Sequence, residues 1–477
     1  MGRAADSQAA SPTSPAVALD YAPPARATVR RGLTAQLILL AAPILAENVL
    51  HMLVGLTDVY LAGKLKTAAH RADATAAIGV VGYVLWLVAM ITGAIGVGST
   101  AIIARAVGAR HRRLANRVCG QSIGAVVMAG VVLAGLCYAG APWFASRSGL
   151  SGQAQEFTFY YFRVLSLSLP FSMVMMAGGA CLRGAGDTLT PAASMIVVDV
   201  VNVVVSFALT RGWWGLPEMG FKGIAIGTVL AYVVGGVLLV GVLLRGSHSL
   251  RLYPHRLHPH WLTLKRILRI GLPSGAGETL AWFAQFAIVL IINRIDATNV
   301  AAAAHILTVR VESLSYLAGY AVSIAAATMV GQSLGMGDPR RASRSAWLAF
   351  ALGGSIMAAW GVVFVFFGRP LAAFFNGDPQ TVDLTARCLF VTAFAQVGFA
   401  ASMVFAGALR GAGDTVVLMT LNLASTIGLR LTGVLIATYW LKLGLVAIWV
   451  VLAAELVIRG GLIILRFLHG GWRHVKV

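Results

Sequence analysis

Long apolar runs, separated by short polar segments, fill the chain between residues 33 and 468. Most runs reach or exceed the roughly 20 residues that an α-helix needs to cross the hydrocarbon core of a bilayer. The pattern therefore predicts twelve membrane-spanning helices. These spans lie near residues 34–62, 76–104, 117–141, 157–181, 189–210, 220–244, 267–293, 302–332, 345–367, 384–408, 416–440 and 443–468.

Basic residues concentrate in every second connecting segment. About 23 Lys and Arg lie in the segments that share a side with the N-terminus, against about 10 in the other segments. If the N-terminus is inside, this excess follows the positive-inside rule and favours an even number of spans. We expect a multi-pass protein of the cytoplasmic (inner) membrane with both termini in the cytoplasm.

The same pattern divides the chain into five parts. We expect a disordered cytoplasmic tail at 1–32, an N-lobe of six spans at 33–245, a cytoplasmic connector at 246–266, a C-lobe of six spans at 267–468 and a cytoplasmic C-terminal tail at 469–477. The first tail is rich in Ala, Ser, Pro and Arg and lacks the apolar segment of a signal peptide.

Composition excludes several classes of function. The chain is 58% hydrophobic and 11% charged, whereas soluble globular domains carry about 25% charged residues. Its net charge of +20 comes from short loops, and no long basic segment with aromatic residues indicates nucleic-acid binding. The four cysteines stand singly, which predicts neither a disulfide framework nor a metal site.

One heptapeptide occurs twice. LRGAGDT fills residues 182–188 and again 409–415, at an offset of 227 residues, and the pair Gly108 and Gly335 repeats at the same offset. Six predicted spans separate the copies, so both halves cross the membrane in the same sense, as parallel repeats do. We therefore predict an all-α polytopic membrane protein with twelve transmembrane helices in two parallel six-helix lobes, and a cleft suited to alternating access.

Each copy of the heptapeptide predicts a structural turn between equivalent helices. Its two glycines permit a tight reversal, its Asp or Thr can cap the following helix, and its Arg is expected to anchor the cytoplasmic interface. The residues with this structural role are Arg183, Gly184, Gly186, Asp187, Arg410, Gly411, Gly413 and Asp414.

Ionisable groups inside the predicted spans are candidates for function, because each costs about 2.5–3.5 kcal/mol at the bilayer centre on insertion scales. Asp58 lies late in the first span. Asp199, Asn202 and Ser206 follow one another at spacings of 3 and 4 in the fifth span, so they share a helix face. Their oxygens suit a hard cation such as sodium, and a carboxylate could equally take a proton. The spacing leaves both open.

Methionine and aromatic residues are candidates for contact with substrate, since methionine adapts to varied apolar ligands. The candidates are Met173, Met176, Phe399 and Met403. We expect a small organic substrate and membrane lipids as partners, a monomeric protein, and no cofactor or resident metal beside the coupling cation.

Four segments resemble the multidrug and toxic compound extrusion (MATE) antiporters. These segments are LTDVYLAGKL after residue 55, the doubled RGAGDT, IGLPSGAGE after residue 269 and VRVESLSYLAGYAVSIAAATMVGQSLGMGDPRRA after residue 308. The resemblance covers about residues 33–468. It implies a two-lobed, MATE-like exporter with twelve helices that exchanges a proton or sodium ion for organic compounds.

The resemblance also implies roles for single residues. Asp58 matches the aspartate that couples the cation in the first span, and Asn202 matches an asparagine near it. Ser206 stands where one branch of the family has an aspartate, and Asp199 is a candidate to replace it. Glu278 is a candidate cation site because some branches carry a carboxylate in this span.

We therefore predict a cation-coupled antiporter that exports cationic or amphipathic organic compounds. A flippase for a lipid or a lipid-linked saccharide is the alternative, since it can share the bundle architecture. A membrane-embedded enzyme is less favoured, because the histidines form no H-E-x-x-H or H-x-x-E-H pattern.

Overall fold

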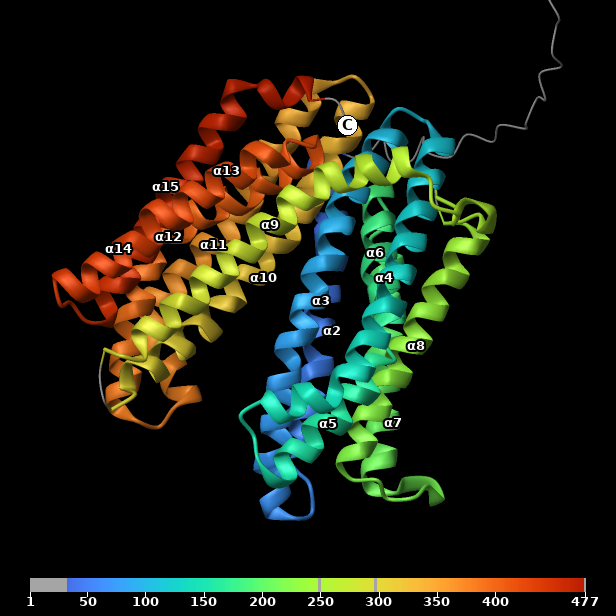
Figure 1. Cartoon of the computed structure of the whole chain (residues 1–477). Coiled ribbons are helices and arrows are strands. Elements are labelled where there is room, and N and C mark those ends of the chain that lie inside the picture. Colours follow the sequence, from blue (N-terminus) through green and yellow to red (C-terminus); the bar gives the residue numbers. More distant parts are fainter. Residues whose placement is uncertain (1–31, 248–249, 296–297, 476–477) are drawn as a thin grey trace, which may run out of the picture.

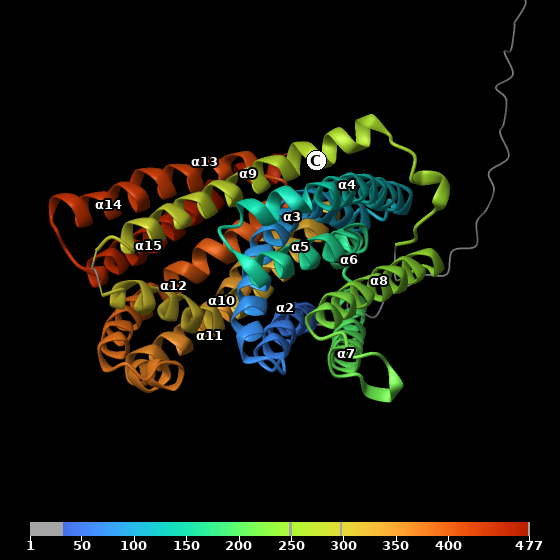
Figure 2. The ribbon, with the colours of Figure 1, turned by 60° about the horizontal axis from the view of Figure 1, so that its bottom comes forward.

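The computed structural model describes residues 32–247, 250–295 and 298–475. The tail predicted at 1–32 lies outside these ranges except for its last residue. The described chain is almost entirely helical, and its helices form two lobes (Figures 1 and 2). The lobes meet at one end and diverge toward the other (Figure 1). The end where the lobes meet carries both LRGAGDT turns and the C-terminal end of the chain, and it is called the turn end below.

The helices lie at the predicted runs. The N-lobe contains α2 (Leu33–Gly63), α3 (Ala68–Gly108), α4 (Arg112–Arg147), α5 (Gly152–Ser166), α6 (Leu169–Ala185), α7 (Leu189–Arg211) and α8 (Phe221–Arg245). The C-lobe contains α9 (Trp261–Ile292), α10 (Val300–Gly335), α11 (Pro339–Phe375), α12 (Pro379–Ala412), α13 (Thr415–Ser425), α14 (Thr432–Leu435) and α15 (Leu445–His469). Several helices, such as α3 and α11, extend past the predicted bounds by up to eight residues.

Twelve spans result when one broken helix is counted as a single crossing. In the described ranges eleven helices are long and apolar enough to cross a membrane, and α5 with α6 makes a twelfth. The segment Thr415–Trp440 counts as one of the eleven and includes two π-helical stretches. The prediction of twelve spans in an all-α fold is confirmed.

The fourth span, predicted near 157–181, is formed by two helices, α5 and α6. Helices α5 and α6 meet at an angle of 54°. Pro170 is the second residue of α6. A proline has no N–H to donate, and its ring clashes with the carbonyl four residues earlier, so Pro170 weakens the helix at this position. Other prolines, such as Pro43 and Pro273, lie inside continuous helices, so the break also depends on the surrounding packing.

The lobes meet mainly through α3, which packs against α9 and α10 of the C-lobe, while α2 packs against α10. Small residues make this approach possible. A Cβ on Gly108 would lie 2.1 Å from the carbonyl oxygen of Gln332, and one on Gly335 would lie 2.2 Å from that of Arg105. The two contacts repeat at the offset of 227 residues, so they lie around the axis that relates the lobes.

Hydrogen bonds across the lobe interface accompany this contact at the turn end. Arg105 of α3 donates to the carbonyl oxygens of Ala412 (2.8 Å) and Val475 (2.7 Å). Gln332 of α10 donates to the carbonyl oxygen of Gly184 (3.2 Å). The acceptors at Ala412 and Gly184 belong to last helical turns, whose carbonyls lack partners within their own helix. Each lobe thus binds the heptapeptide turn of the other.

Replacing Arg105 or Gln332 by Met is expected to favour separation of the lobes at the turn end. A hydrogen bond that involves a charged group contributes about 1.5–3 kcal/mol, so loss of the Arg105 bonds should shift the equilibrium tenfold or more. The readout is alkylation of an Ala104→Cys variant in a background without native cysteines, because Ala104 is fully buried at this interface. Exposed Arg112→Met is the control, and an unchanged alkylation rate in both interface variants would contradict the expectation.

The connector between the lobes is held against α4. Gln121 donates to the carbonyl oxygens of Arg256 (2.7 Å) and His258 (2.6 Å), and its own oxygen accepts the His260 N–H (2.6 Å). Helix α9 already begins at Trp261, inside the segment predicted as connector.

Residues after α15 also pack onto the protein. Trp472 is fully buried, its ring lies 4.7 Å from that of Phe467, and its indole N–H donates to the Phe467 carbonyl at 2.7 Å. This contact fixes the neighbouring Arg473, whose guanidinium lies 5.5 Å from the Trp472 ring.

Candidate functional site

A cluster of polar side chains surrounds Asp58 inside the N-lobe. Asp58 lies late in α2 and is 2% exposed. The Tyr161 hydroxyl of α5 donates to Asp58 Oδ2 at 2.8 Å. The Thr228 hydroxyl of α8 lies 2.9 Å from Oδ1 and 2.8 Å from Oδ2. Three helices therefore converge on one carboxylate.

Helix α7 adds an amide and a hydroxyl to this cluster. Asn202 Nδ2 lies 3.4 Å from Asp58 Oδ1 and 3.0 Å from the Thr228 hydroxyl, and Ser206 Oγ lies 3.5 Å from the same nitrogen. Asn202 and Ser206 are both fully buried. Among the described residues, Asn202 Oδ1 has no hydrogen-bond partner, so one acceptor oxygen beside the carboxylate is available.

The cluster depends on the close approach of α7 and α8. A Cβ on Gly227 would lie 2.1 Å from Ser206 Oγ and 2.7 Å from the Ser206 backbone nitrogen. Gly227 directly precedes Thr228, so the glycine brings the threonine hydroxyl to Asp58. Small residues at helix contacts in membranes allow such approach.

The donor set indicates the chemistry of the cluster. It consists of one carboxylate, one amide and three hydroxyl groups, and in the described part of the chain no Lys or Arg forms an ion pair with Asp58. A buried charge without a counter-charge is costly, so the site favours a bound cation. Oxygen ligands suit sodium, and the carboxylate can equally bind a proton.

Asp199 lies outside this cluster. It is 8% exposed, and both of its carboxylate oxygens lack hydrogen-bond partners among the described residues. Tyr232 of α8 lies within electrostatic reach of both Asp58 and Asp199. The structure thus brings Asp58, Asn202 and Ser206 together and leaves Asp199 on another part of the same helix.

Tyr161 and Thr228 were missed by the sequence analysis. They lie 103 and 170 residues from Asp58, and no local spacing connects them to it. One signal was present: Thr228 is a polar residue within the strongly apolar span at 220–244.

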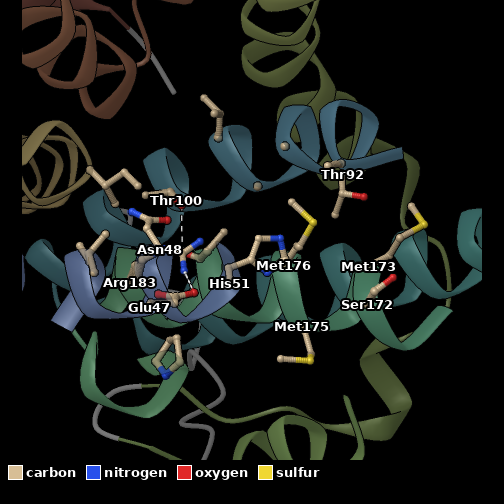
Figure 3. Close-up of a pocket in the computed structure, with 18 of the residues that line it drawn as sticks. Glu47, Asn48, His51, Thr92, Thr100, Ser172, Met173, Met175, Met176 and Arg183 are labelled. Carbon is tan, nitrogen blue, oxygen red and sulfur yellow. Dashed lines mark hydrogen bonds and ion pairs between the residues drawn. The ribbon is translucent and has the colours of Figure 1, made fainter. Parts of the chain in front are cut away.

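A cavity of about 310 Å³ lies between the lobes. Helices α2, α3 and α6 supply the labelled side chains in Figure 3, including Glu47, Asn48 and His51 of α2. The C-lobe adds Glu278, Tyr320 and other residues from α9, α10 and α12. The cavity is therefore lined by both lobes, and α2 lines the cavity while also carrying Asp58.

Two ion pairs lie at this cavity, one in each lobe. Arg183 pairs with Glu47 (Figure 3), with Nη1 2.6 Å from Oε1, and Arg410 Nη2 is 3.1 Å from Glu278 Oε1. Arg183 and Arg410 are equivalent residues of the two heptapeptides. We expected them to anchor the cytoplasmic interface, and that is corrected: each points into the cavity because a carboxylate of its own lobe lies there.

Only the second glycine of each heptapeptide makes the turn. Gly186 and Gly413 have φ values of 91° and 80°, a conformation that favours glycine. Gly184 and Gly411 are still helical. A Cβ on Gly411 would lie 2.0 Å from the Ala327 carbonyl oxygen, so the first glycine serves close helix packing instead.

The aspartates of the two turns differ. Asp187 caps the next helix, since its Oδ1 accepts the Thr190 N–H at 3.0 Å. Asp414 makes no such cap and accepts a hydrogen bond from Arg466 Nε at 2.9 Å. The predicted cap is therefore present in the first copy only.

The predicted substrate contacts separate into two pairs. Met173 and Met176 line the cavity. Phe399 lies 5.9 Å from Tyr316, ring to ring, and Met403 Sδ packs near Gly319, and neither residue is among those that line this cavity. In the described ranges, no group of three or more His, Cys, Asp or Glu side chains could hold a metal ion.

The fold and the two sites define a membrane transporter with two lobes of six spans each, a cavity between them and a separate polar site in the first lobe. Comparison with known proteins agrees. The MatE family model matches residues 43–208 and 273–436, and the chain belongs to this family.

One curated relative and two solved structures resemble this chain over most of their length. The probable multidrug resistance protein NorM of Thermotoga maritima is 30% identical, over 92% of each chain. A crystal structure of MATE in the bent conformation has a TM-score of 0.85 at 20% identity, over 93% of this chain and 97% of that one. VcmN, a MATE transporter of Vibrio cholerae, has a TM-score of 0.82 at 19% identity, over 92% and 96% of the two chains. The protein is a multi-pass membrane transporter of the multidrug efflux type and not an enzyme.

Proposed function

We propose that this transporter exports cationic or amphipathic organic compounds in exchange for protons or sodium ions, and that Asp58 binds the coupling cation. One observation carries the proposal. Asp58 is a buried carboxylate that has only neutral partners among the described residues, and it lies on a helix that also lines the central cavity.

Helix α2 offers a physical route for coupling. Binding of a cation at Asp58 changes the hydrogen bonds that α5, α7 and α8 make to α2. The same helix presents Glu47, Asn48 and His51 to the cavity. A ligand in the cavity and a cation at Asp58 therefore both act on the position of α2, and such coupling is reciprocal in the two binding free energies.

The cavity supports an organic cation or an amphipath as the substrate. Methionine and other apolar side chains form much of its wall, and the Glu278 side chain is 43% exposed there. Apolar walls with a few placed charges suit a ligand that carries an apolar body and a charged group. Met173 and Met176 are the proposed apolar contacts, and Glu278 the proposed contact for positive charge.

We further propose that the protein acts as a monomer in the cytoplasmic membrane with the turn end in the cytoplasm. The basic loops support this orientation, because most Lys and Arg of the connecting segments lie at that end. In this orientation the end where the lobes meet faces the cytoplasm.

The test uses inverted membrane vesicles that contain the full chain. A proton or a sodium gradient is imposed separately, and ethidium or rhodamine 6G is added as the organic cation. We expect the dyes to dissipate one of the two gradients, which identifies the coupling ion.

Vesicles without the protein are the control. A second set of vesicles measures translocation of fluorescent phospholipids. If neither gradient responds to either dye while phospholipid translocation depends on the protein, the export proposal is wrong and the flippase alternative holds.

A further inference from the structure

A strongly basic groove opens on the C-lobe at the turn end. Arg340 and Arg344 of α11 line it together with Arg473, which follows α15. All three side chains are exposed, and none forms an ion pair with another described residue. The nearby Asp338 caps α11 by accepting the Arg341 N–H at 2.8 Å. Three guanidinium groups thus surround one open space.

The groove becomes apolar toward the middle of α11. Trp347 lies one to two turns beyond the arginines, and Leu348 and Ala351 continue the wall. Trp347 is 39% exposed, and its ring is held at 5.0 Å from that of Phe405 in an edge contact. Tryptophan is enriched where a membrane protein meets the headgroup region. Positive charge at the helix start and an apolar wall below it match the cross-section of a lipid leaflet.

The equivalent surface of the N-lobe is occupied. At the offset of 227 residues, Trp347, Leu348 and Ala351 correspond to Gly120, Gln121 and Gly124 of α4. In the N-lobe those residues contact the connector: a Cβ on Gly120 or Gly124 would lie 2.8 or 2.6 Å from connector carbonyl oxygens.

The equivalent surfaces of the two lobes therefore differ in their residues and in what covers them. The N-lobe surface has glycines that admit a segment of the chain, and the connector fills it. The C-lobe surface has a large aromatic residue where the N-lobe has Gly120, and no described residue of the chain covers it. Arg340 and Arg344 have counterparts in the N-lobe, Arg113 and Arg117, so the two surfaces differ in the aromatic residue and in the cover. The composition of the C-lobe surface suits an anionic ligand with an apolar body.

We propose that this groove is a binding site for the headgroup of an anionic phospholipid, with the phosphate held by Arg340, Arg344 and Arg473 and the acyl chains along Trp347 and Leu348. Guanidinium groups bind phosphate oxygens in bidentate fashion. Basic pockets near the cytoplasmic ends of membrane helices recognise such lipids. The site is separate from the central cavity, so it does not depend on the exported compound.

The site has a structural consequence for the lobes. Arg473 lies close in sequence to Val475, whose carbonyl accepts a hydrogen bond from Arg105 of the N-lobe. A lipid that fixes Arg473 thus also holds the segment that Arg105 binds. The lipid is expected to favour the state in which the lobes meet at the turn end.

The experiment measures lipid binding to the purified full-length protein by native mass spectrometry. The probes are cardiolipin, phosphatidylglycerol and phosphatidylcholine, each added alone. We expect the two anionic lipids to bind at least tenfold more tightly than phosphatidylcholine. In a triple variant with Arg340→Gln, Arg344→Gln and Arg473→Gln, this preference should fall about tenfold or more.

A matched variant removes the same charge from exposed arginines of the turn end outside the groove. It carries Arg110→Gln, Arg112→Gln and Arg245→Gln, and its lipid preference should stay within about twofold of the unmodified protein. The proposal is overturned if the two triple variants lose the preference equally, because that result indicates a general charge effect.

Two further arms make the result decisive. Inorganic phosphate at millimolar concentration should not displace cardiolipin, and Trp347→Ala should weaken cardiolipin binding. If phosphate displaces the lipid and Trp347→Ala has no effect, the groove binds free phosphate compounds and the lipid proposal is wrong. Should the triple variant be unstable in detergent, Arg344→Gln alone is tested, with Arg112→Gln as its control. Because binding is read without transport, the result is independent of the proposed export function.

Discussion

Asp58→Asn is expected to abolish dye-dependent dissipation of the coupling gradient, down to the rate of vesicles without protein. The substitution keeps the size of the side chain and the oxygen that Tyr161 and Thr228 contact. It removes the charge that a cation must neutralise. The asparagine amide cannot gain and lose a proton at the pH of the assay. It is also a far weaker sodium ligand than a carboxylate. The transport cycle therefore loses its driving ion while the fold remains.

The measurement compares initial rates in vesicles with equal amounts of protein. Asp383→Asn is the matched control, since Asp383 is a 51% exposed carboxylate that pairs with Arg369 on the surface. Its rate should equal that of the unmodified transporter. Asp199→Asn is measured alongside, and its rate shows whether this second buried carboxylate, which lies on α7, also takes part. A coupled rate that survives in Asp58→Asn would refute the assignment of Asp58.

Gly227→Val is expected to destabilise the N-lobe and to stop transport. Even a Cβ at this position would lie 2.1 Å from Ser206 Oγ and 2.8 Å from the Ser206 Cα, so α8 must move away from α7. Overpacking of this kind costs about 1–3 kcal/mol and occasionally more. The shift also carries Thr228 away from Asp58, because Thr228 directly follows Gly227 on α8.

Thermal unfolding of the purified protein in detergent measures the first effect, and the vesicle assay measures the second. Gly241→Val is the control on the same helix, since nothing lies within 4 Å of a Cβ at that position. We expect a lower melting temperature and no coupled transport for Gly227→Val, and little change for Gly241→Val. Equal melting temperatures for the two variants would show that the close contact at Gly227 does not limit stability.

Most of the fold could be predicted because each membrane-spanning helix corresponds to one long apolar run in the sequence. In a bilayer every backbone polar group must be satisfied within the segment, so an apolar run of sufficient length becomes a helix. This explains why the bounds of α2 and α7 agree with the predicted spans within one residue. The bend at Pro170 was not predicted, because proline is tolerated in many membrane helices and its effect depends on the packing around it.

The sequence indicates an ion pair only where both partners lie on one helix at a suitable spacing. Glu455 lies 2.6 Å from Arg430 and 3.4 Å from Arg459. The pair with Arg459 follows from the spacing of four residues on one helix. The pairs at the cavity, such as Glu47 with Arg183, join residues 136 positions apart. No helical periodicity predicts such a contact.

The polar cluster around Asp58 shows the same limit. Asn202 and Ser206 lie together because both belong to one face of α7, and the sequence showed that face. Tyr161 and Thr228 come from two other helices, and their positions depend on how α5 and α8 pack. Asp199 lies on the same face of α7 as Asn202 and Ser206 and is still separate from Asp58. One face of a long helix extends further than the few ångströms that a single cluster covers.

The most direct measurement of the central claim is ion release on binding of substrate. Purified protein in detergent is equilibrated with protons or with ²²Na⁺, and ethidium is then added without any gradient. We predict that ethidium displaces protons or sodium from the unmodified protein and displaces neither from Asp58→Asn. Displacement of the same ion in equal amount from Asp58→Asn would contradict the account.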